Sequence, residues 1–339
     1  MAKLGIGIHG CGWVSDEHIR AYRNNPHVKL VALSSRRVKS ARAKREEHDL
    51  DCDVEQSFED LIGRKDVDAV SICSAAHCHP RETVLAARAK KHILIEKPVA
   101  LTLKDLKAMR DAVRKAKVRT VVSFVLRWNP FLQTVKSLVD RGKLGKVFFV
   151  EGDYFHDYGD WYTGYSWSRK KKMGGSPILL GGCHTIDALR WVAGDVSEVM
   201  AYATRGHRED LEWLPSIVGV ARFKSGAIGK IGCSLEMPMP YQCNLLVHGS
   251  KGVVRNNRIF SKEEFPGQTD FMDLPTIMPD SGDVEHHPFR GEIDHFVECI
   301  LKGKESFVNL EDAVKTHEVA IAFDRAAATG KPVKLPLLK

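Results

Sequence analysis

The chain has 339 residues, of which 43% are hydrophobic and 28% charged, and its formal net charge is +8. This length is sufficient for two domains, and the composition excludes disordered and fibrous proteins. No apolar run reaches the length of a membrane span, and the eight cysteines form no Cys-x-x-Cys pair. We therefore expect a cytoplasmic protein without a membrane segment, a zinc ribbon or a disulfide framework.

The first segment of the chain has the pattern of a dinucleotide-binding turn. Residues 3–8 are an apolar run predicted as a buried strand, Gly10 and Gly12 follow, and residues 16–22 continue as a helix. Such a turn presents free backbone N–H groups and a positive helix end to a diphosphate. Gly10 permits the tight turn and Gly12 a close phosphate, whereas Ser15 replaces the third glycine of the pattern. We expect a dinucleotide to be bound by Gly10, Gly12, Trp13 and Val14.

The residues that follow the next predicted strand, 28–33, indicate which dinucleotide this is. NAD-binding proteins place Asp or Glu here to bind the ribose hydroxyls. This chain has Ser35, Arg36 and Arg37, a hydroxyl and two guanidinium groups that form charge-assisted hydrogen bonds with a 2′-phosphate. We therefore predict NADP as the cofactor; the alternative is that both arginines only face water.

Strand and helix patterns alternate through residues 1–124 and change afterwards. The alternation predicts a doubly wound parallel sheet, with further strands at 67–73, 92–95 and 119–125. Later strands follow one another with short turns, at 146–153, 199–204, 216–223, 226–235 and 242–248. Helices are expected at 183–192, 292–302 and 310–329. We predict an α/β domain over 1–124 and an α+β domain with a mostly antiparallel open sheet over 125–339.

Two peptides follow strands of the predicted parallel sheet, at the edge where such sheets bind ligands. The first is Ser74-Ala75 with His79 shortly after it, and the second is Glu96-Lys97-Pro98. A lysine at this edge can place a positive charge beside a substrate hydroxyl, and burial can lower its pKa. We expect cofactor contacts from Ser74, Ala75, His79, Glu96 and Lys97, and substrate binding and catalysis from Lys97.

A second candidate group follows a pair of glycines. His184 and Asp187 lie three residues apart, on one face of the helix predicted after Gly181 and Gly182. Histidine can exchange a proton with a hydroxyl, while aspartate orients the ring or binds substrate. The glycines would let a ligand approach closely. We predict both His184 and Asp187 as catalytic and substrate-binding; the alternative is an ordinary helix cap or side-chain pair.

Aromatic residues are dense in the segment 154–162. Aromatic rings stack on the apolar faces of sugars, so we predict Tyr158 and Trp161 as substrate-binding residues; the alternative is a core or a subunit interface. His286 and His287 have no neighbouring ligand set, so no metal site is predicted. The basic residues are spread over amphipathic segments such as 104–117, and we therefore predict no nucleic-acid partner.

Taken together, these motifs resemble the Gfo/Idh/MocA oxidoreductases. The resemblance covers essentially the whole chain, through the Gly10–Gly12 turn with His18 and residues 67–70, 96–98, 127–130, 181–187 and 248–252. It implies a Rossmann domain followed by an open-sheet domain whose sheet forms homodimers or homotetramers. It also implies reversible hydride transfer between a nicotinamide and a sugar, inositol or related polyol.

The resemblance also implies individual roles. Lys97 corresponds to the catalytic lysine and His184 to the acid/base, with Asp187 in support, while Arg127 and Asn129 match a stretch near the active site and are predicted as substrate contacts. Leu180 stands where many inositol-type members carry Asp, which argues against an inositol dehydrogenase.

The sequence therefore predicts an NADP-dependent sugar or polyol oxidoreductase. One alternative is a redox-neutral epimerase or glycosidase that retains and recycles its cofactor. Another is a regulator that binds the dinucleotide or a sugar without catalysis.

Overall fold

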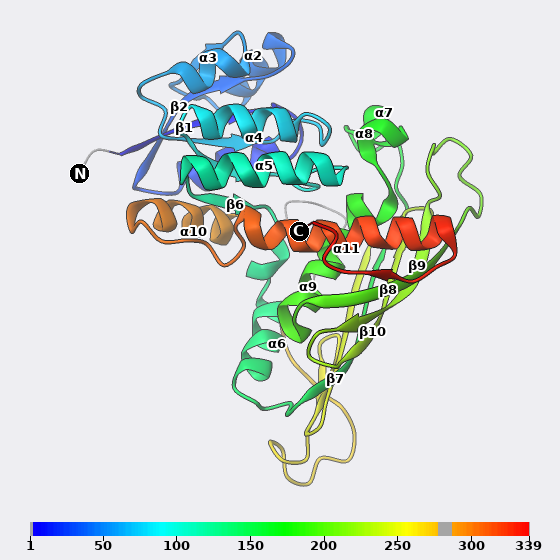
Figure 1. Ribbon diagram of the computed structural model, residues 1–339. Coiled ribbons are helices and arrows are strands. Elements are labelled where there is room, and N and C mark those ends of the chain that lie inside the picture. The colour runs from blue at the N-terminus through cyan, green and yellow to red at the C-terminus, as the bar shows by residue number, and fades with distance from the viewer. Residues whose placement is uncertain (1–2, 277–286, 339) are drawn as a thin grey trace.

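The computed structural model describes residues 3–276 and 287–338, and contains two sheets with helices packed on them (Figure 1). The first sheet is parallel, with the order β3-β2-β1-β4-β5-β6. Its strands are β1 (Leu4–His9), β2 (Val28–Ser34), β3 (Asp53–Glu55), β4 (Ala69–Ile72), β5 (His92–Ile95) and β6 (Thr120–Val122). The order reverses between β1 and β4, which is where sheets of this type bind ligands.

The helices of this part are α1 (Ser15–Arg23), α2 (Val38–Glu47), α3 (Phe58–Gly63), α4 (His79–Arg88) and α5 (Leu103–Ala116). Side-chain caps begin two of them: Ser57 Oγ accepts from the Asp60 N–H at 3.0 Å, and Thr102 Oγ1 from the Asp105 N–H at 3.1 Å. The central strands are buried on both faces, as their continuous apolar runs indicate. The predicted doubly wound Rossmann sheet is confirmed.

The second sheet has nine strands in the order β14-β13-β12-β11-β7-β10-β9-β8-β15. They are β7 (Val147–Phe155), β8 (Val196–Thr204), β9 (Ser216–Phe223), β10 (Ile228–Ser234), β11 (Gln242–Gly249), β12 (Val253–Arg255), β13 (Arg258–Phe260), β14 (Met272–Asp273) and β15 (Val333–Lys334). Pairing is antiparallel except between β10 and β7, which run parallel. The predicted mostly antiparallel sheet is therefore confirmed.

Further helical segments follow β6 and flank β7, before the helices that pack on the second sheet. They are the turn η1 (Val125–Trp128), α6 (Pro130–Asp140), α7 (Tyr165–Ser168), α8 (Lys171–Gly174) and the π-helical turn η2 (Ile178–Gly182). The long helices are α9 (Cys183–Ala193), α10 (Phe289–Leu301) and α11 (Leu310–Thr329). Helices α9 and α11 pack on one face of the second sheet, against β7 and β8 (Figure 1).

The last third of the chain also returns to the first sheet. The Val122 N–H donates to the Val308 carbonyl at 3.0 Å, and the Leu310 N–H donates to Thr120 Oγ1 at 2.9 Å. Helix α10 packs on α1, where Asn25 donates to Asp294 at 2.7 Å. A division after residue 124 therefore separates the two sheets, but α10 packs with the first one.

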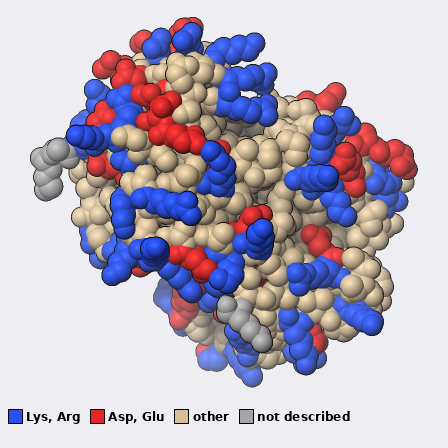
Figure 2. All heavy atoms as spheres, turned by 45° about the horizontal axis from the view of Figure 1, so that its top comes forward, with Lys and Arg blue, Asp and Glu red and all other residues tan. Residues whose placement is uncertain are grey.

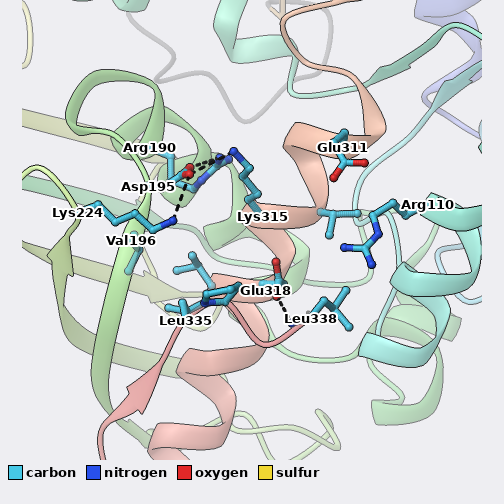
Figure 3. A pocket seen from close by; sticks show the side chains of 13 residues that line it. Arg110, Arg190, Asp195, Val196, Lys224, Glu311, Lys315, Glu318, Leu335 and Leu338 are labelled. Atoms are coloured by element: carbon cyan, nitrogen blue, oxygen red, sulfur yellow. Dashed lines mark hydrogen bonds and ion pairs between the residues drawn. The ribbon is translucent and has the colours of Figure 1, made fainter. Parts of the chain in front are cut away.

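The surface carries basic and acidic side chains side by side. On the face shown in Figure 2, lysines and arginines alternate with aspartates and glutamates and form no continuous basic area. A hollow between α5, α9, α11 and the C-terminal residues has the same character, because Asp195 is paired there with Arg190, Lys224 and Lys315 (Figure 3). Within the described ranges, no helix has the length and apolarity of a membrane span.

One partly buried carboxyl leads to a testable pH dependence of stability. Ser176 donates to Asp324 at 2.7 Å, and burial raises the pKa of Asp324 to about 7. In the unfolded chain this carboxyl ionises near pH 4, so stability decreases as the pH rises from about 4 to 7. We expect Asp324→Asn to stabilise the protein more at pH 8 than at pH 5, by about 2 kcal/mol. Urea denaturation at both values measures this, and an equal effect at both would contradict it.

Candidate active site

The glycine turn after β1 leaves room and free donors for a diphosphate. Gly10 has a φ of +94°, and a Cβ there would lie 2.4 Å from the Ser74 nitrogen, so only glycine fits. A Cβ on Gly12, by contrast, would meet nothing within 4 Å. The N–H groups of Gly12, Trp13 and Val14 donate to no described residue, and no side chain caps the first turn of α1. The turn therefore fits a dinucleotide, as predicted.

The serine and arginines after β2 border this turn. Ser35 Oγ accepts from the Cys11 N–H at 3.4 Å, which places the hydroxyl beside the turn. Arg36 and Arg37 are exposed and form no ion pair with any residue that the structure describes. Burial lowers the pKa of His77, and the nearby charge of Arg36 contributes to the same effect. The charge of Arg36 therefore acts on the β4–α4 loop, which borders the glycine turn.

The β4–α4 loop supplies backbone donors. His79, the first residue of α4, contacts a carbonyl of this loop. The Ser74 and Ala75 N–H groups donate to no described residue, so both remain available to a cofactor. His79 is 1% exposed, and its two ring nitrogens each lie 2.9 Å from a carbonyl oxygen, of Ser74 and of Pro98. The structure thus gives the predicted cofactor ligand His79 a different place: it connects this loop to the lysine peptide.

The lysine peptide links the two parts of the protein. Glu96 is buried, and its Oε1 lies 3.0 Å from His18 Nε2. Lys97 is half-buried, and its Nζ donates to the Leu180 carbonyl at 3.3 Å. Position 180, where an aspartate was expected in inositol-type members, therefore contributes a backbone acceptor to the lysine.

His184 lies at the same end of the site, in a mostly apolar environment. The side chain is 4% exposed. Its ring stacks on Tyr154, with 6.2 Å between the ring centroids, and has an edge contact with Phe124, with 6.0 Å between the centroids. Neither ring nitrogen bonds a described residue, and Nδ1 is fully occluded. Burial, followed by the charge of Lys97, lowers the pKa of His184 well below its usual value. The ring is therefore neutral at physiological pH and able to accept a proton.

A row of aromatic side chains extends from the histidine toward the glycine turn. The distance between ring centroids is 5.0 Å for Tyr154 and Tyr241, 5.4 Å for Tyr241 and His156, and 5.1 Å for His156 and Trp161. Trp161 is 49% exposed and lies 6.1 Å from Trp13 of the turn. The row includes predicted Trp161 and two other residues of the aromatic-rich segment 154–162, whereas Tyr241 was not predicted.

Two predicted substrate residues have other roles. Tyr158 is buried in the loop before α7, where its hydroxyl bonds the Ser168 hydroxyl, so the core alternative describes it. Asn129 is 2% exposed, and its Oδ1 accepts from the Phe131 N–H at 2.9 Å as the cap of α6. Both side chains are bonded within the protein.

Asp187 and Arg127 bind each other. Two hydrogen bonds of 2.7 Å join the guanidinium to both carboxylate oxygens, and Thr316 Oγ1 donates to Asp187 at 3.1 Å. Arg127 also donates to Asp312 at 2.6 Å. Burial would lower the pKa of Arg127, but the two carboxylates outweigh it and raise that pKa. Asp187 therefore does not orient the His184 ring; the pair joins α9 to η1 and α11.

The two glycines before α9 serve packing within the protein. A Cβ on Gly181 would lie 2.5 Å from the Tyr154 ring, and one on Gly182 would lie 2.5 Å from Ile178 and 3.0 Å from Cys233. We had expected these glycines to let a ligand approach closely. Instead they let η2 pack closely against β7 and β10.

The site has clear counterparts among known proteins. Residues 4–124 match the profile of an oxidoreductase family with an NAD-binding Rossmann fold, and residues 132–255 match the GFO/IDH/MocA C-terminal domain. The myo-inositol 2-dehydrogenase of Thermotoga maritima is 30% identical over 256 residues, which cover 74% of each chain. The levoglucosan dehydrogenase of Pseudarthrobacter phenanthrenivorans is 30% identical over 216 residues, covering 59% of this chain and 54% of that one.

Solved structures agree on the fold. A levoglucosan dehydrogenase in complex with NADH superimposes with a TM-score of 0.90 at 21% identity, over 98% of this chain and 99% of the other. The WlbA dehydrogenase from Bordetella pertussis, in complex with NADH and UDP-GlcNAcA, gives 0.87 at 24% identity, over 99% of both chains. The chain therefore belongs to the Gfo/Idh/MocA family of sugar and polyol oxidoreductases, with an N-terminal fold that binds a nicotinamide dinucleotide.

Proposed function

We propose that this protein is an NADP-dependent oxidoreductase that transfers a hydride between nicotinamide and a carbinol carbon of a carbohydrate or cyclic polyol. The observation that carries the proposal is the pairing of Lys97 with a neutral His184. The charge of Lys97 contributes to the lowered pKa of His184, and no described residue bonds either ring nitrogen. A cation and a free base at the carboxyl end of the first sheet suit the oxidation of a hydroxyl.

The residues divide the proton chemistry between them. When bound, the cofactor supplies or accepts the hydride. The Lys97 ammonium stabilises the negative charge that develops on the substrate oxygen as its proton leaves. His184 accepts this proton in oxidation and returns it in reduction, through Nε2 because Nδ1 is occluded. Tyr154, His156 and Trp161 provide aromatic surface for a sugar ring.

The NADP preference rests on Arg36 and Arg37. We expect Arg36→Ala/Arg37→Ala to weaken NADPH binding about 30-fold, because two charge-assisted contacts to the 2′-phosphate are lost. NADH binding should change less than about threefold, since NADH lacks that phosphate. Nicotinamide fluorescence titrations measure both, with the exposed Lys39→Ala on α2 as the matched control. If the wild type binds NADH as tightly as NADPH, the two arginines only face water.

A substrate panel tests the reaction itself. Purified protein is incubated with NADP⁺ and sugars or cyclic polyols, and NADPH absorbance and the products are followed together. Net NADPH formation supports the proposal. Product without a net change of NADPH would identify the redox-neutral alternative. Ligand binding without any turnover would identify a regulator.

We also propose a cytoplasmic homo-oligomer built on the uncovered face of the second sheet. Tyr202, Val218 and Val220 are 69%, 49% and 58% exposed on adjacent strands, opposite the face that α11 covers. Such a contiguous apolar area is typical of an interface. All eight cysteines are free thiols, which fits a reducing compartment.

We expect Val220→Arg to convert a dimer or tetramer into a smaller species, because the new charge would be buried at the contact. Sedimentation velocity measures this, with Lys224→Glu outside the apolar area as control. A wild-type monomer would contradict the interface.

A further inference from the structure

One buried carboxyl of the protein has no partner. Glu292 in α10 is 0% exposed, and neither of its oxygens forms a hydrogen bond with a residue that the structure describes. Ser123 Oγ and His18 Nδ1 are also occluded without a bond. An ionised carboxylate in such a place would carry a large desolvation cost, whereas a protonated one would not.

Glu292 lies near Glu96, the first residue of the lysine peptide, and the charge of Glu96 acts on it. Helix α10 packs on α1, with the Phe289 ring 5.5 Å from the His18 ring, and His18 binds Glu96. The polar groups that face Glu292 come from the end of β5, the segment after β6, α1 and the end of β4: Glu96, Ser123, His18, Tyr22 and Cys73. Among the described residues, no lysine or arginine bonds it.

The two neighbouring carboxyls have opposite environments. Burial and the charge of Glu96 raise the pKa of Glu292 well above its usual range. Burial also acts on Glu96, but the bond to His18 and the charge of Lys97 outweigh it and lower the pKa of Glu96. Two neighbouring acids whose pKa values are shifted in opposite directions titrate as a pair, and between the two pKa values the pair carries one negative charge.

We propose that Glu292 and Glu96 hold one proton between them, with Glu292 the protonated member, and that Glu292 is a positioning residue for Lys97. A protonated Glu292 adds no second negative charge beside Glu96, whose charge acts on it. Glu96 Oε2 in turn accepts from the Lys97 N–H at 3.1 Å. Glu96 thus holds the Lys97 backbone. Because Glu292 is protonated, the two carboxyls together carry a single negative charge near the Lys97 ammonium. Only the catalytic use of Lys97 rests on the proposed function.

The first experiment counts protons. Unfolded glutamate is ionised at pH 7, so a protonated Glu292 releases about one proton when the protein unfolds. Urea unfolding in weak buffer with a pH indicator should give about one proton less for Glu292→Gln than for the wild type. Glu298→Gln, an exposed change on the same helix, should release as many protons as the wild type. Equal release by wild type and Glu292→Gln overturns the shared proton.

The second experiment measures Lys97 directly. The rate of Lys97 acetylation by acetic anhydride is followed from pH 6 to 10 by peptide mass spectrometry, with exposed Lys104 as internal reference. Glu292→Gln, still a neutral donor, should match the wild type at pH 7. Glu292→Leu, which cannot donate, should change the rate at pH 8 by at least about threefold, because the lysine backbone is no longer held in the same place. An unchanged rate in folded Glu292→Leu overturns the positioning role. Neither measurement needs a sugar, so failure to find a substrate would affect the proposed function alone.

Discussion

Lys97→Met lowers kcat by about 1,000-fold while the binding of NADPH changes less than about threefold. The reason is that the charge of Lys97 acts on the neutral His184, and methionine keeps the length of the side chain without its charge. Without the ammonium, the oxygen of the substrate develops negative charge with no counter-charge beside it. Single-turnover absorbance measurements of NADPH formation, with the substrate found in the panel, give the rate.

Lys104→Met on α5 is the control, because Lys104 is exposed and lies outside the site. It should keep the wild-type rate. A Lys97→Met enzyme that retained more than about a tenth of the wild-type kcat would contradict the role of Lys97 in stabilising charge on the substrate oxygen. A loss of NADPH binding instead would assign Lys97 to the cofactor rather than to the reaction.

Asp187→Ala lowers the free energy of unfolding by about 3 kcal/mol. Asp187 and Arg127 are 2% and 3% exposed, and both carboxylate oxygens accept from the guanidinium. Removing the carboxylate leaves a buried cation with Asp312 as its remaining acidic partner, since Arg127 also binds that residue. Urea denaturation of the two proteins measures the difference.

The double variant Arg127→Met/Asp187→Leu separates pairing from catalysis. It should recover more than half of the lost stability, because no charge then remains unpaired in the core. If Asp187→Ala keeps the wild-type stability but loses turnover, Asp187 acts in the reaction, as the sequence predicted. In that case its bond to Arg127 would be incidental.

Residues close together in sequence were the ones that the sequence could place. The Gly10–Gly12 turn, the end of β5 at Lys97 and the start of α9 at His184 follow from short-range patterns, because strand and helix periods extend over a few residues. That the first sheet is parallel and doubly wound follows from the alternation of strand and helix. These patterns sufficed for the fold class and for the two residues that carry the proposed chemistry.

Longer-range pairing was not visible in the same way. Tyr154 joins the aromatic row because β7 pairs with β11, which brings Tyr241 to it through the register Cys243↔Tyr154. Alternation along β7 could have favoured Tyr154, but no local signal pointed to Tyr241. The return of α10 to α1, which places Glu292 behind Glu96, is also a contact between distant segments.

By itself, then, the sequence determined the dinucleotide turn, the two-sheet architecture and the positions of Lys97 and His184. Only the tertiary structure decided that Arg127 and Asp187, 60 residues apart, neutralise each other. The physical reason is that a polar residue at a given spacing can cap a helix, pair with a charge or bind a ligand with equal local fit. Which of these it does depends on the partner that folding brings within hydrogen-bonding distance.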